Sequence, residues 1–227
     1  MRCDGDPWPF APGQYVTLGI DAGTGLVERP YSIASSARRV DDGYELYVRL
    51  VPEGALTPLL FAGSPGRRVT LRRPKGRFTL RDGDDRVHLF VATGCGLAPF
   101  MSMLRTLVDE RAPRRVVLLH GVSYVAELSY REELERLVHD PRWQLVYVPT
   151  ISRPREPANT GWAGCVGRVE RILPEVWADL GLTSTATMAY LCGNPGMVIS
   201  AREFLRQRGF GAEQVREELY WPRAERR

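Results

Sequence analysis

The strongest constraint on the fold is a change of pattern near residue 85. From there on, short runs of consecutive apolar residues alternate with segments of helical periodicity. A run such as residues 87–92 (VHLFVA) has no polar face, so a strand formed by it must be covered on both sides. Strands of this kind that are separated by helices predict a parallel sheet, because a crossover helix returns the chain to the same end of the sheet.

In this α/β part, the expected strands are 87–92, 116–120, 144–148, 188–192 and 215–221, and the expected helices are 97–110, 129–138 and 196–207. Counting the strands along the chain, we expect a five-stranded parallel sheet in the order 3-2-1-4-5, which is typical of nucleotide-binding domains.

Before residue 85 the runs are short, alternate between apolar and polar residues, and are interrupted by clusters of Gly, Pro and Asp. This pattern is typical of antiparallel strands, here expected at 14–20, 44–50 and 67–73, with a helical insert at 56–62. We therefore expect two domains, an antiparallel β-barrel over residues 1–84 and an α/β domain over residues 85–227.

Composition argues against several classes of protein. The net charge is +4, and no arginine run is interleaved with aromatic residues, so no nucleic-acid partner is expected. The four cysteines form no CxxC pair and there are three histidines, so no metal site is expected. No apolar run reaches the ~20 residues of a membrane helix. The N-terminus does not read as a signal peptide, so we expect a cytoplasmic location and no membrane partner.

Two glycine-rich turns follow predicted strands, at residues 93–100 (TGCGLAPF) and 192–197 (CGNPGM). Glycine lets a ligand approach the main chain, and a helix N-terminus offers amide groups to phosphate. One such turn often only tightens a connection. In the order 3-2-1-4-5, however, both turns follow neighbouring strands and flank one crevice, which indicates a dinucleotide site.

Motifs along nearly the whole chain resemble those of the ferredoxin–NADP reductase family, most of all its bacterial branch. In order, they are FAPGQY (10–15), RPYSIA (29–34), PEGALT (52–57), GCGLAPF (94–100), SR (152–153), LCGNPGM (191–197) and ELYW (218–221). The resemblance implies an N-terminal FAD-binding barrel and a C-terminal nicotinamide-binding α/β domain. The family barrel has two strands before the first of these motifs, which here begins at residue 10. Either the true start of the protein lies upstream or the barrel is shortened, and for this sequence we expect a barrel that lacks its first strands and has an open edge.

The RPYS motif is the most specific of the set. By resemblance, Arg29 binds the FAD pyrophosphate, Tyr31 lies along the isoalloxazine ring, and the Ser32 hydroxyl approaches the flavin N5. A guanidinium suits a two-point contact with phosphate, and tyrosine offers a flat face with a polar tip. Thr57, which begins the helical insert, would give its hydroxyl and nearby amides to the same pyrophosphate.

The resemblance also implies the contacts on the coenzyme side. Cys192 would help to position the nicotinamide, although a buried thiol is often a small apolar filler. Glu218 matches a family glutamate linked to proton and electron transfer, and a solvated charge explains it equally well. Tyr220 and Trp221 match a C-terminal aromatic residue that stacks on FAD. The expected pyrophosphate and nicotinamide contacts are Gly94, Cys95 (usually threonine in the family), Gly96, Pro99, Cys192, Gly193 and Asn194.

Recognition of the NADPH 2′-phosphate is expected beyond the second and third strands. Arg153 and Arg168 match family positions that grip this phosphate, and Tyr130 matches one near the adenosine. Ser123 departs from the pattern, because many bacterial members carry arginine there. No acidic residue directly follows the second strand to bind a ribose hydroxyl, so NADPH is expected to be preferred over NADH.

Together these features predict an FAD-dependent reductase that passes electrons from NADPH to a separate ferredoxin or flavodoxin. Hydride would pass to flavin N5 and single electrons to the carrier, and the residues allow the reverse direction. The alternatives are an NAD(P)H-dependent reductase for an oxygenase or for free flavin, and a non-catalytic nucleotide-binding regulator.

A basic rim could receive an acidic partner, although a solvated strand pair also explains these charges. The rim would comprise Arg67, Arg68, Arg72, Arg73, Lys75 and Arg77.

Overall fold

The computed structural model of the protein describes residues 7–220. The chain divides into two compact units, the first made of residues up to 81 together with 98–111, and the second of residues 82–97 and those from 112 on. Helix α2 (Ala98–Glu110) therefore belongs to the first unit, although it follows the first strand of the second. The domain boundary expected between residues 84 and 85 stays a prediction.

The first unit is built on a three-stranded antiparallel sheet in the order β2-β1-β3. Its central strand is β1, in which Val16, Leu18 and Ile20 are buried at alternating positions, as expected for a strand with one face on the core. The elements of this unit are β1 (Tyr15–Asp21), β2 (Leu26–Ser32), η1 (Val40–Asp42), α1 (Thr57–Phe61), β3 (Thr70–Lys75) and α2 (Ala98–Glu110).

The predicted barrel is an open sheet in the part of the chain that the structure describes, where β2 and β3 each pair only with β1. The strand predicted at 44–50 is wrong, since this segment makes only a single bridge between Leu46 and Ile33. Its alternating pattern has another cause. Tyr44 is buried, and its hydroxyl donates to the Trp8 carbonyl at 2.6 Å, so the side chains pack on the core without a neighbouring strand to complete a ladder.

Helix α2 is attached to the first unit by polar contacts. The Thr106 hydroxyl accepts a hydrogen bond from the Ala37 amide at 2.9 Å. Near the end of the helix, the Arg39 guanidinium donates to both carboxylate oxygens of Asp109, at 2.9 and 3.0 Å from its Nε. Arg105 donates to the Ala34 carbonyl at 2.9 Å.

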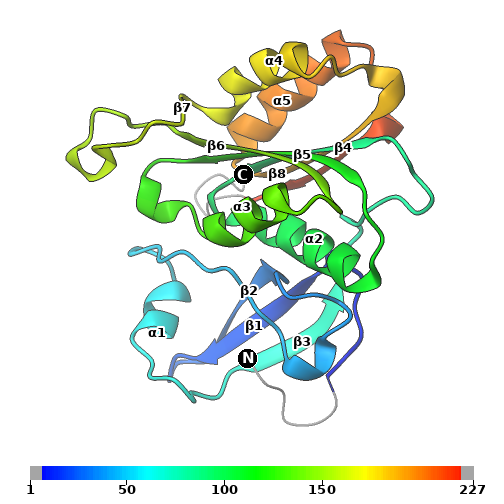
Figure 1. Ribbon diagram of the computed structural model, residues 1–227. Helices are drawn as coiled ribbons and strands as arrows, with labels where there is room; N and C mark the ends of the chain where they lie inside the picture. The colour runs from blue at the N-terminus through cyan, green and yellow to red at the C-terminus, as the bar shows by residue number, and fades with distance from the viewer. Residues whose placement is uncertain (1–6, 221–227) are drawn as a thin grey trace. The chain divides into compact units, whose positions relative to one another are not determined.

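The second unit contains a six-stranded parallel sheet in the order β7-β6-β5-β4-β8-β9 (Figure 1). Its strands are β4 (Val87–Thr93), β5 (Arg115–Val122), β6 (Gln144–Ile151), β7 (Cys165–Val166), β8 (Thr187–Gly193) and β9 (Val215–Leu219). The prediction of five strands in the order 3-2-1-4-5 is therefore wrong in its count and in one edge, because β7 lies outside β6. A strand of two exposed residues is too short to leave a periodic signal. The predicted neighbourhood of the first and fourth strands is confirmed, since β4 pairs with β8.

Helices cover both faces of this sheet, with α4 and α5 on one face and α3 on the other (Figure 1). The helical elements of the unit are η2 (Gly94–Leu97), η3 (Val125–Glu127), α3 (Arg131–His139), η4 (Pro157–Asn159), α4 (Val169–Asp179), η5 (Ser184–Ala186), α5 (Pro195–Gln207) and η6 (Ala212–Gln214). None of the helices in the described part of the chain has the length and hydrophobicity that crossing a membrane requires.

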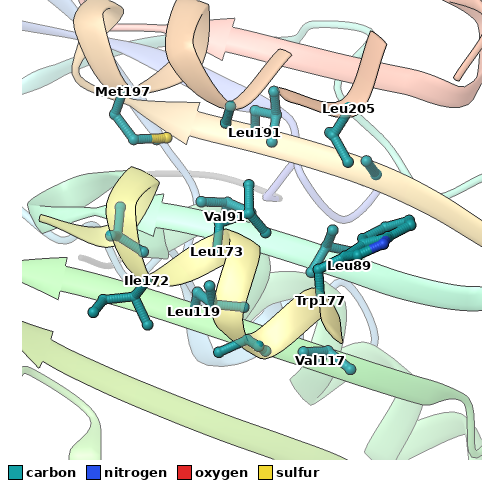
Figure 2. Close-up of a cluster of buried hydrophobic side chains, with 14 of the residues drawn as sticks. Leu89, Val91, Val117, Leu119, Ile172, Leu173, Trp177, Leu191, Met197 and Leu205 are labelled. Carbon is teal, nitrogen blue, oxygen red and sulfur yellow. The ribbon is translucent and has the colours of Figure 1, made fainter. Parts of the chain in front are cut away.

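Helix α4 was not predicted, because Pro174 interrupts its sequence and proline normally ends a helix. The helix nevertheless buries Leu173 and Trp177, four residues apart on one face. Figure 2 shows these side chains packed with Leu89 and Val91 of β4 and with the inner residues of α5. This core fixes the strand ends where the candidate site is built.

Candidate functional site

The two glycine-rich turns interlock at the carboxyl ends of β4 and β8. Gly96 packs so closely on the other turn that an added Cβ would lie 2.2 Å from the carbonyl oxygen of Cys192. Gly193, with φ +131°, packs on Thr93 in the same way, and a Cβ there would lie 2.3 Å from the threonine hydroxyl. Each of these two glycines is buried, and the opposite turn occupies the space that a side chain would need, so the two turns pack directly on each other and fix the main chain at this edge of the sheet.

Asn194 precedes α5 and caps the N-terminus of this helix with its side chain. Its side-chain oxygen accepts hydrogen bonds from the amides of Gly196 at 2.9 Å and Met197 at 3.4 Å, and its own amide donates to the Thr93 hydroxyl at 2.8 Å. The first amides of α5 are thus bonded within the chain. Asn194 shapes the turn, and its expected contact with the coenzyme stays a prediction.

Beneath the first turn lies His120, a fully buried residue of β5 that is paired in register with Ala92 of β4. Its Nε2 is 3.3 Å from the Gly94 carbonyl oxygen, which can only accept, so the proton must be on Nε2. Nδ1 finds no hydrogen-bond partner within the described residues. Burial lowers the pKa of His120 to about 4, so the ring is neutral at physiological pH and supports the turn, in which Gly94 has a φ of +50°.

Cys192 is buried at the end of β8, and the structure brings it together with two predicted residues. Glu218 of β9 is its partner in register, and the Tyr220 amide donates to the Gly193 carbonyl at 2.8 Å. Burial raises the pKa of the Cys192 thiol well above its usual value, the Glu218 charge raises it further, and a hydrogen bond with Tyr220 partly offsets both. The thiol is therefore protonated and suited to packing or weak hydrogen bonding. Trp221 lies outside the described residues.

The two arginines expected to recognise the 2′-phosphate follow paired strands. Ile151 of β6 pairs in parallel register with Val166 of β7, and Arg153 and Arg168 each come two residues later. Both are exposed at the same edge of the sheet. Arg153 donates to the Tyr124 hydroxyl at 2.7 Å, with its guanidinium 5.4 Å from the centre of that ring. The strand missed in the sequence is thus the element that places Arg168 beside the end of β6.

Ser123 and Tyr130 lie on the segment that follows β5. The Ser123 amide donates to the Glu127 carboxylate at 2.9 Å, as does the Tyr124 amide at 3.2 Å. Tyr130 has a φ of +62°, which is uncommon for a residue with a side chain, and it turns the chain into α3. Pro99 lies in the first turn of α2, and Cys95 lies in η2 between Gly94 and Gly96.

The RPYS motif lies on β2 in the first unit. Arg29 and Tyr31 share one face of this strand, and Ser32, which is buried, lies on the other. Arg29 is partly exposed and donates to the Glu28 carbonyl at 2.6 Å. Tyr31 is half-buried against the core residues around Leu18. This face combines a guanidinium with a flat aromatic ring, which fits the phosphate and ring system of a flavin nucleotide.

Thr57 begins α1, as expected, but its hydroxyl is already bonded within the first unit. The oxygen accepts from the Val51 amide at 2.9 Å and donates to the Val51 carbonyl at 3.1 Å. The residue therefore stabilises the loop that leads into α1. Its direct contact with a pyrophosphate stays a prediction.

Known proteins share both units of the chain. Residues 7–80 match the oxidoreductase FAD-binding domain, and residues 90–203 match the oxidoreductase NAD-binding domain. Ferredoxin–NADP reductase B of Sorangium cellulosum is 34% identical over 96% of this chain and 88% of that protein. The chain belongs to the ferredoxin–NADP reductase family.

Two further relatives show the range of this reductase family. The electron transfer component of xylene/toluene monooxygenase from Pseudomonas putida is 31% identical over 94% of this chain, which spans 58% of that protein. The solved ferredoxin–NADP⁺ reductase of Neisseria gonorrhoeae with bound FAD and NADP has a TM-score of 0.81 and 27% identity, and covers 94% of this chain and 88% of its own. The family, the flavoenzyme class and the two cofactor-binding domains predicted from the sequence are thereby confirmed.

The basic rim expected on the reductase is partly engaged within the first unit. Arg72 binds both carboxylate oxygens of Glu28, at 2.6 and 2.7 Å, so this pair adds no net charge. The Arg73 guanidinium lies 5.6 Å from the Trp8 ring centre, and the Lys75 ammonium lies 5.7 Å from that of Tyr15. Contacts with aromatic rings leave these two charges in place, so a basic surface remains compatible with the structure.

Sequence reasoning missed the polar residues that organise the nucleotide edge of the reductase. They lie outside the family motifs, and their partners are up to 36 residues away in the chain. A single histidine at the end of an apolar strand was a usable signal for His120. The set comprises His120, Tyr124, Glu127 and Asn159.

Proposed function

We propose that this reductase transfers electrons between NADPH and a ferredoxin or flavodoxin. The observation that carries the proposal is the interlocking of the turns after β4 and β8, which the buried Gly96 and Gly193 allow, at the carboxyl edge where a parallel sheet binds nucleotides. A sequence identity of 34% with a ferredoxin–NADP reductase, over 96% of this chain, supports the choice of carrier. FAD, when bound, supplies the conversion between hydride and single-electron transfer.

The chain's own residues would orient the two nucleotides. In the proposal, Arg29 binds the flavin pyrophosphate, while Tyr31 and Ser32 contact the flavin ring from β2. Gly94, Cys95, Gly96 and Pro99 hold the coenzyme pyrophosphate, and the nicotinamide is positioned by Cys192, Gly193, Asn194, Glu218 and the C-terminal aromatic residues. The domain division at residues 84 and 85 and a cytoplasmic location are also part of the proposal.

Preference for NADPH is supported by the pair of exposed arginines beyond β6 and β7. Arg153 and Arg168 both follow strands that pair in register, so two exposed guanidinium groups lie at the edge where the adenosine ribose would lie, that of Arg168 at 4.0 Å from the Glu170 carboxylate. Ser123 and Tyr130 follow β5 at the same edge. A phosphate dianion gains more from two guanidinium groups than a ribose hydroxyl does.

The second candidate is a reductase component that delivers electrons to an oxygenase. It is favoured by 31% identity with the xylene/toluene monooxygenase component over 94% of this chain. The two candidates share the flavin and coenzyme chemistry and differ in the protein that receives the electrons. The non-catalytic regulator is not supported, since the chain belongs to a family of flavoenzymes.

The first experiment is the visible spectrum of the purified protein, followed by oxidation of NADPH and NADH with ferricyanide. We expect a bound flavin that is released as FAD, and NADPH oxidation at lower coenzyme concentrations than NADH oxidation. Protein that binds no FAD, even after reconstitution, would contradict the proposal. The Arg29→Ala variant should lose FAD, whereas Arg208→Ala, on the second unit, should retain it.

The carrier is tested by NADPH-dependent reduction of cytochrome c through added ferredoxin or flavodoxin. Electrostatic attraction to an acidic carrier predicts a KM for the carrier that rises with ionic strength. Reduction of cytochrome c that is unaffected by either carrier would favour the oxygenase component or free flavin instead.

A further inference from the structure

We infer that Asn159 is a positioning residue for recognition of the coenzyme 2′-phosphate. Nothing in the family motifs singles it out, and it does not reach the edge of the sheet itself, since only 2% of its surface is exposed. It lies in η4, on the long segment between β6 and β7 (yellow-green in Figure 1), and its amide joins the loops that carry Ser123 and Arg153.

The side chain of Asn159 makes three hydrogen bonds to main-chain groups. Nδ2 donates to the Ser123 carbonyl at 3.0 Å and to the Arg153 carbonyl at 2.7 Å. Oδ1 accepts from the Val125 amide at 2.8 Å. Both donors of the amide are thus used, and each bond runs to a different residue.

Only an amide of this length meets the pattern. Aspartate would place an oxygen against two carbonyl oxygens, and alanine would leave two carbonyls and one amide without these partners. Buried polar groups left unsatisfied are costly, so the two loops would move to find other partners. The groups displaced first would be those anchored next to Asn159, namely Ser123 and Arg153.

Tyr124 holds the side chain of Arg153, whose main chain is bonded to Asn159. Its main chain lies between Ser123 and Val125, the two residues bonded to Asn159 on that loop, and its hydroxyl accepts a hydrogen bond from Arg153 at 2.7 Å. Arg153 is therefore held at its main chain by Asn159 and at its guanidinium by Tyr124. Preorganising a long, exposed arginine in this way lowers the entropy lost when it binds a phosphate.

The inference rests on the proposed preference for NADPH and deepens it. The test measures the Kd values of NADP⁺ and NAD⁺ for the FAD-loaded protein, since these ligands differ only by the 2′-phosphate. For Asn159→Ala we expect the Kd of NADP⁺ to rise at least about tenfold and that of NAD⁺ less than about threefold, with kcat at saturating NADPH unchanged. Thr160→Ala, in the same exposed segment, is the matched control and should alter neither Kd.

If Asn159→Ala raises the Kd values of NADP⁺ and NAD⁺ equally, Asn159 supports the unit as a whole. If neither Kd changes, Asn159 does not position Arg153. Each result overturns the inference. Arg153→Ala, measured in parallel, distinguishes a failure of the role of Asn159 from a failure of the proposed NADPH preference. If that variant leaves the ratio of the two Kd values unchanged, the proposed basis of NADPH preference fails; if it alters the ratio while Asn159→Ala does not, only the inference fails.

Should Asn159→Ala not fold, Tyr124→Phe provides the test, because it removes one hydroxyl and retains the aromatic ring. We then expect a smaller, selective rise in the Kd of NADP⁺. An unchanged ratio in Tyr124→Phe would overturn the inference.

Discussion

Gly96 lies against the carbonyl group of Cys192 with no room for a methyl group between them, since a Cβ at residue 96 would come within 2.2 Å of the carbonyl oxygen. The two residues are almost a hundred positions apart in the chain. Their contact depends on the pairing of β4 with β8, which brings both turns to the same edge of the sheet. A requirement for glycine here is therefore a consequence of strand order.

Replacing Gly96 by alanine should displace one of the two turns. We expect a loss of about 1–3 kcal/mol in the free energy of unfolding, because the added methyl group overpacks the contact between the turns. We also expect the KM for NADPH to rise, because the displaced main chain is the part that would contact the coenzyme. Urea unfolding and steady-state kinetics measure the two effects. Gly196→Ala is the control, since its added Cβ would lie 3.1 Å from the nearest atom, the Asn194 side-chain oxygen. Equal effects of the two substitutions would contradict the prediction.

Arg153→Ala should weaken the use of NADPH more than that of NADH. A charge-assisted hydrogen bond contributes ~1.5–3 kcal/mol, so the ratio of kcat/KM for NADPH to that for NADH should fall at least about tenfold. Arg155→Ala, which removes an exposed arginine from the same segment, is the control. If Arg153→Ala affects both coenzymes alike, Arg153 does not discriminate between them.

Cys192 should resist alkylation in the native protein. Burial and the Glu218 charge keep its thiol protonated, whereas Cys165 on β7 is exposed. At about pH 8, iodoacetamide should label Cys165 at least about a hundredfold faster than Cys192, because the thiolate is the reactive form. Mass spectrometry of peptides from native and urea-treated protein measures the labelling, and comparable rates in the native protein would refute the prediction.

His120 should make the second unit less stable in acid. Its pKa is lowered from 6.5 to about 4, so below about pH 6.5 the unfolded chain binds a proton that the folded chain does not. Stability is therefore complete above that pH and is lost as the pH falls toward about 4. Between about pH 7 and about pH 5 the loss from this group is on the order of 2 kcal/mol.

Urea unfolding of His120→Gln at several pH values measures this contribution. The variant should lose part of the pH dependence of the unfolding free energy, while His139→Gln, which alters an exposed histidine of α3, should retain the part that comes from His120. The same pH dependence in His120→Gln and the parent protein would show that His120 is not the group responsible. His88, whose pKa is also lowered by burial, accounts for some of the remaining dependence.

The elements that could be predicted from the sequence are those in which residue type reflects burial or close packing of the main chain. Buried strands such as β4 and β8 have continuous apolar runs, and the turns after them are visible because their close packing on each other requires glycine. β7 and α4 were missed for opposite reasons: β7 has two residues and no period, and α4 has a clear apolar face interrupted by Pro174.

The candidate site follows the same division. Arg153 and Gly96 were found because they lie in motifs, but the side chains that hold them were not. Asn159 stabilises its neighbours through main-chain groups of residues 123, 125 and 153, and main-chain partners leave no trace in residue types. Asn194 and Thr57 show the converse, since residue types that suit a ligand also form hydrogen bonds within their own loops.

The assignment of α2 to the first unit has a consequence for how such reductases can recombine. A single crossover between two related genes near residue 84 would pair an N-terminal sheet from one parent with a helix from the other, and would have to recreate the contacts of Thr106 with Ala37 and of Asp109 with Arg39. A chimera that keeps these pairs needs a second exchange covering residues 98–111. The coding sequence of the N-terminal unit is thus split, and its two pieces must be inherited together.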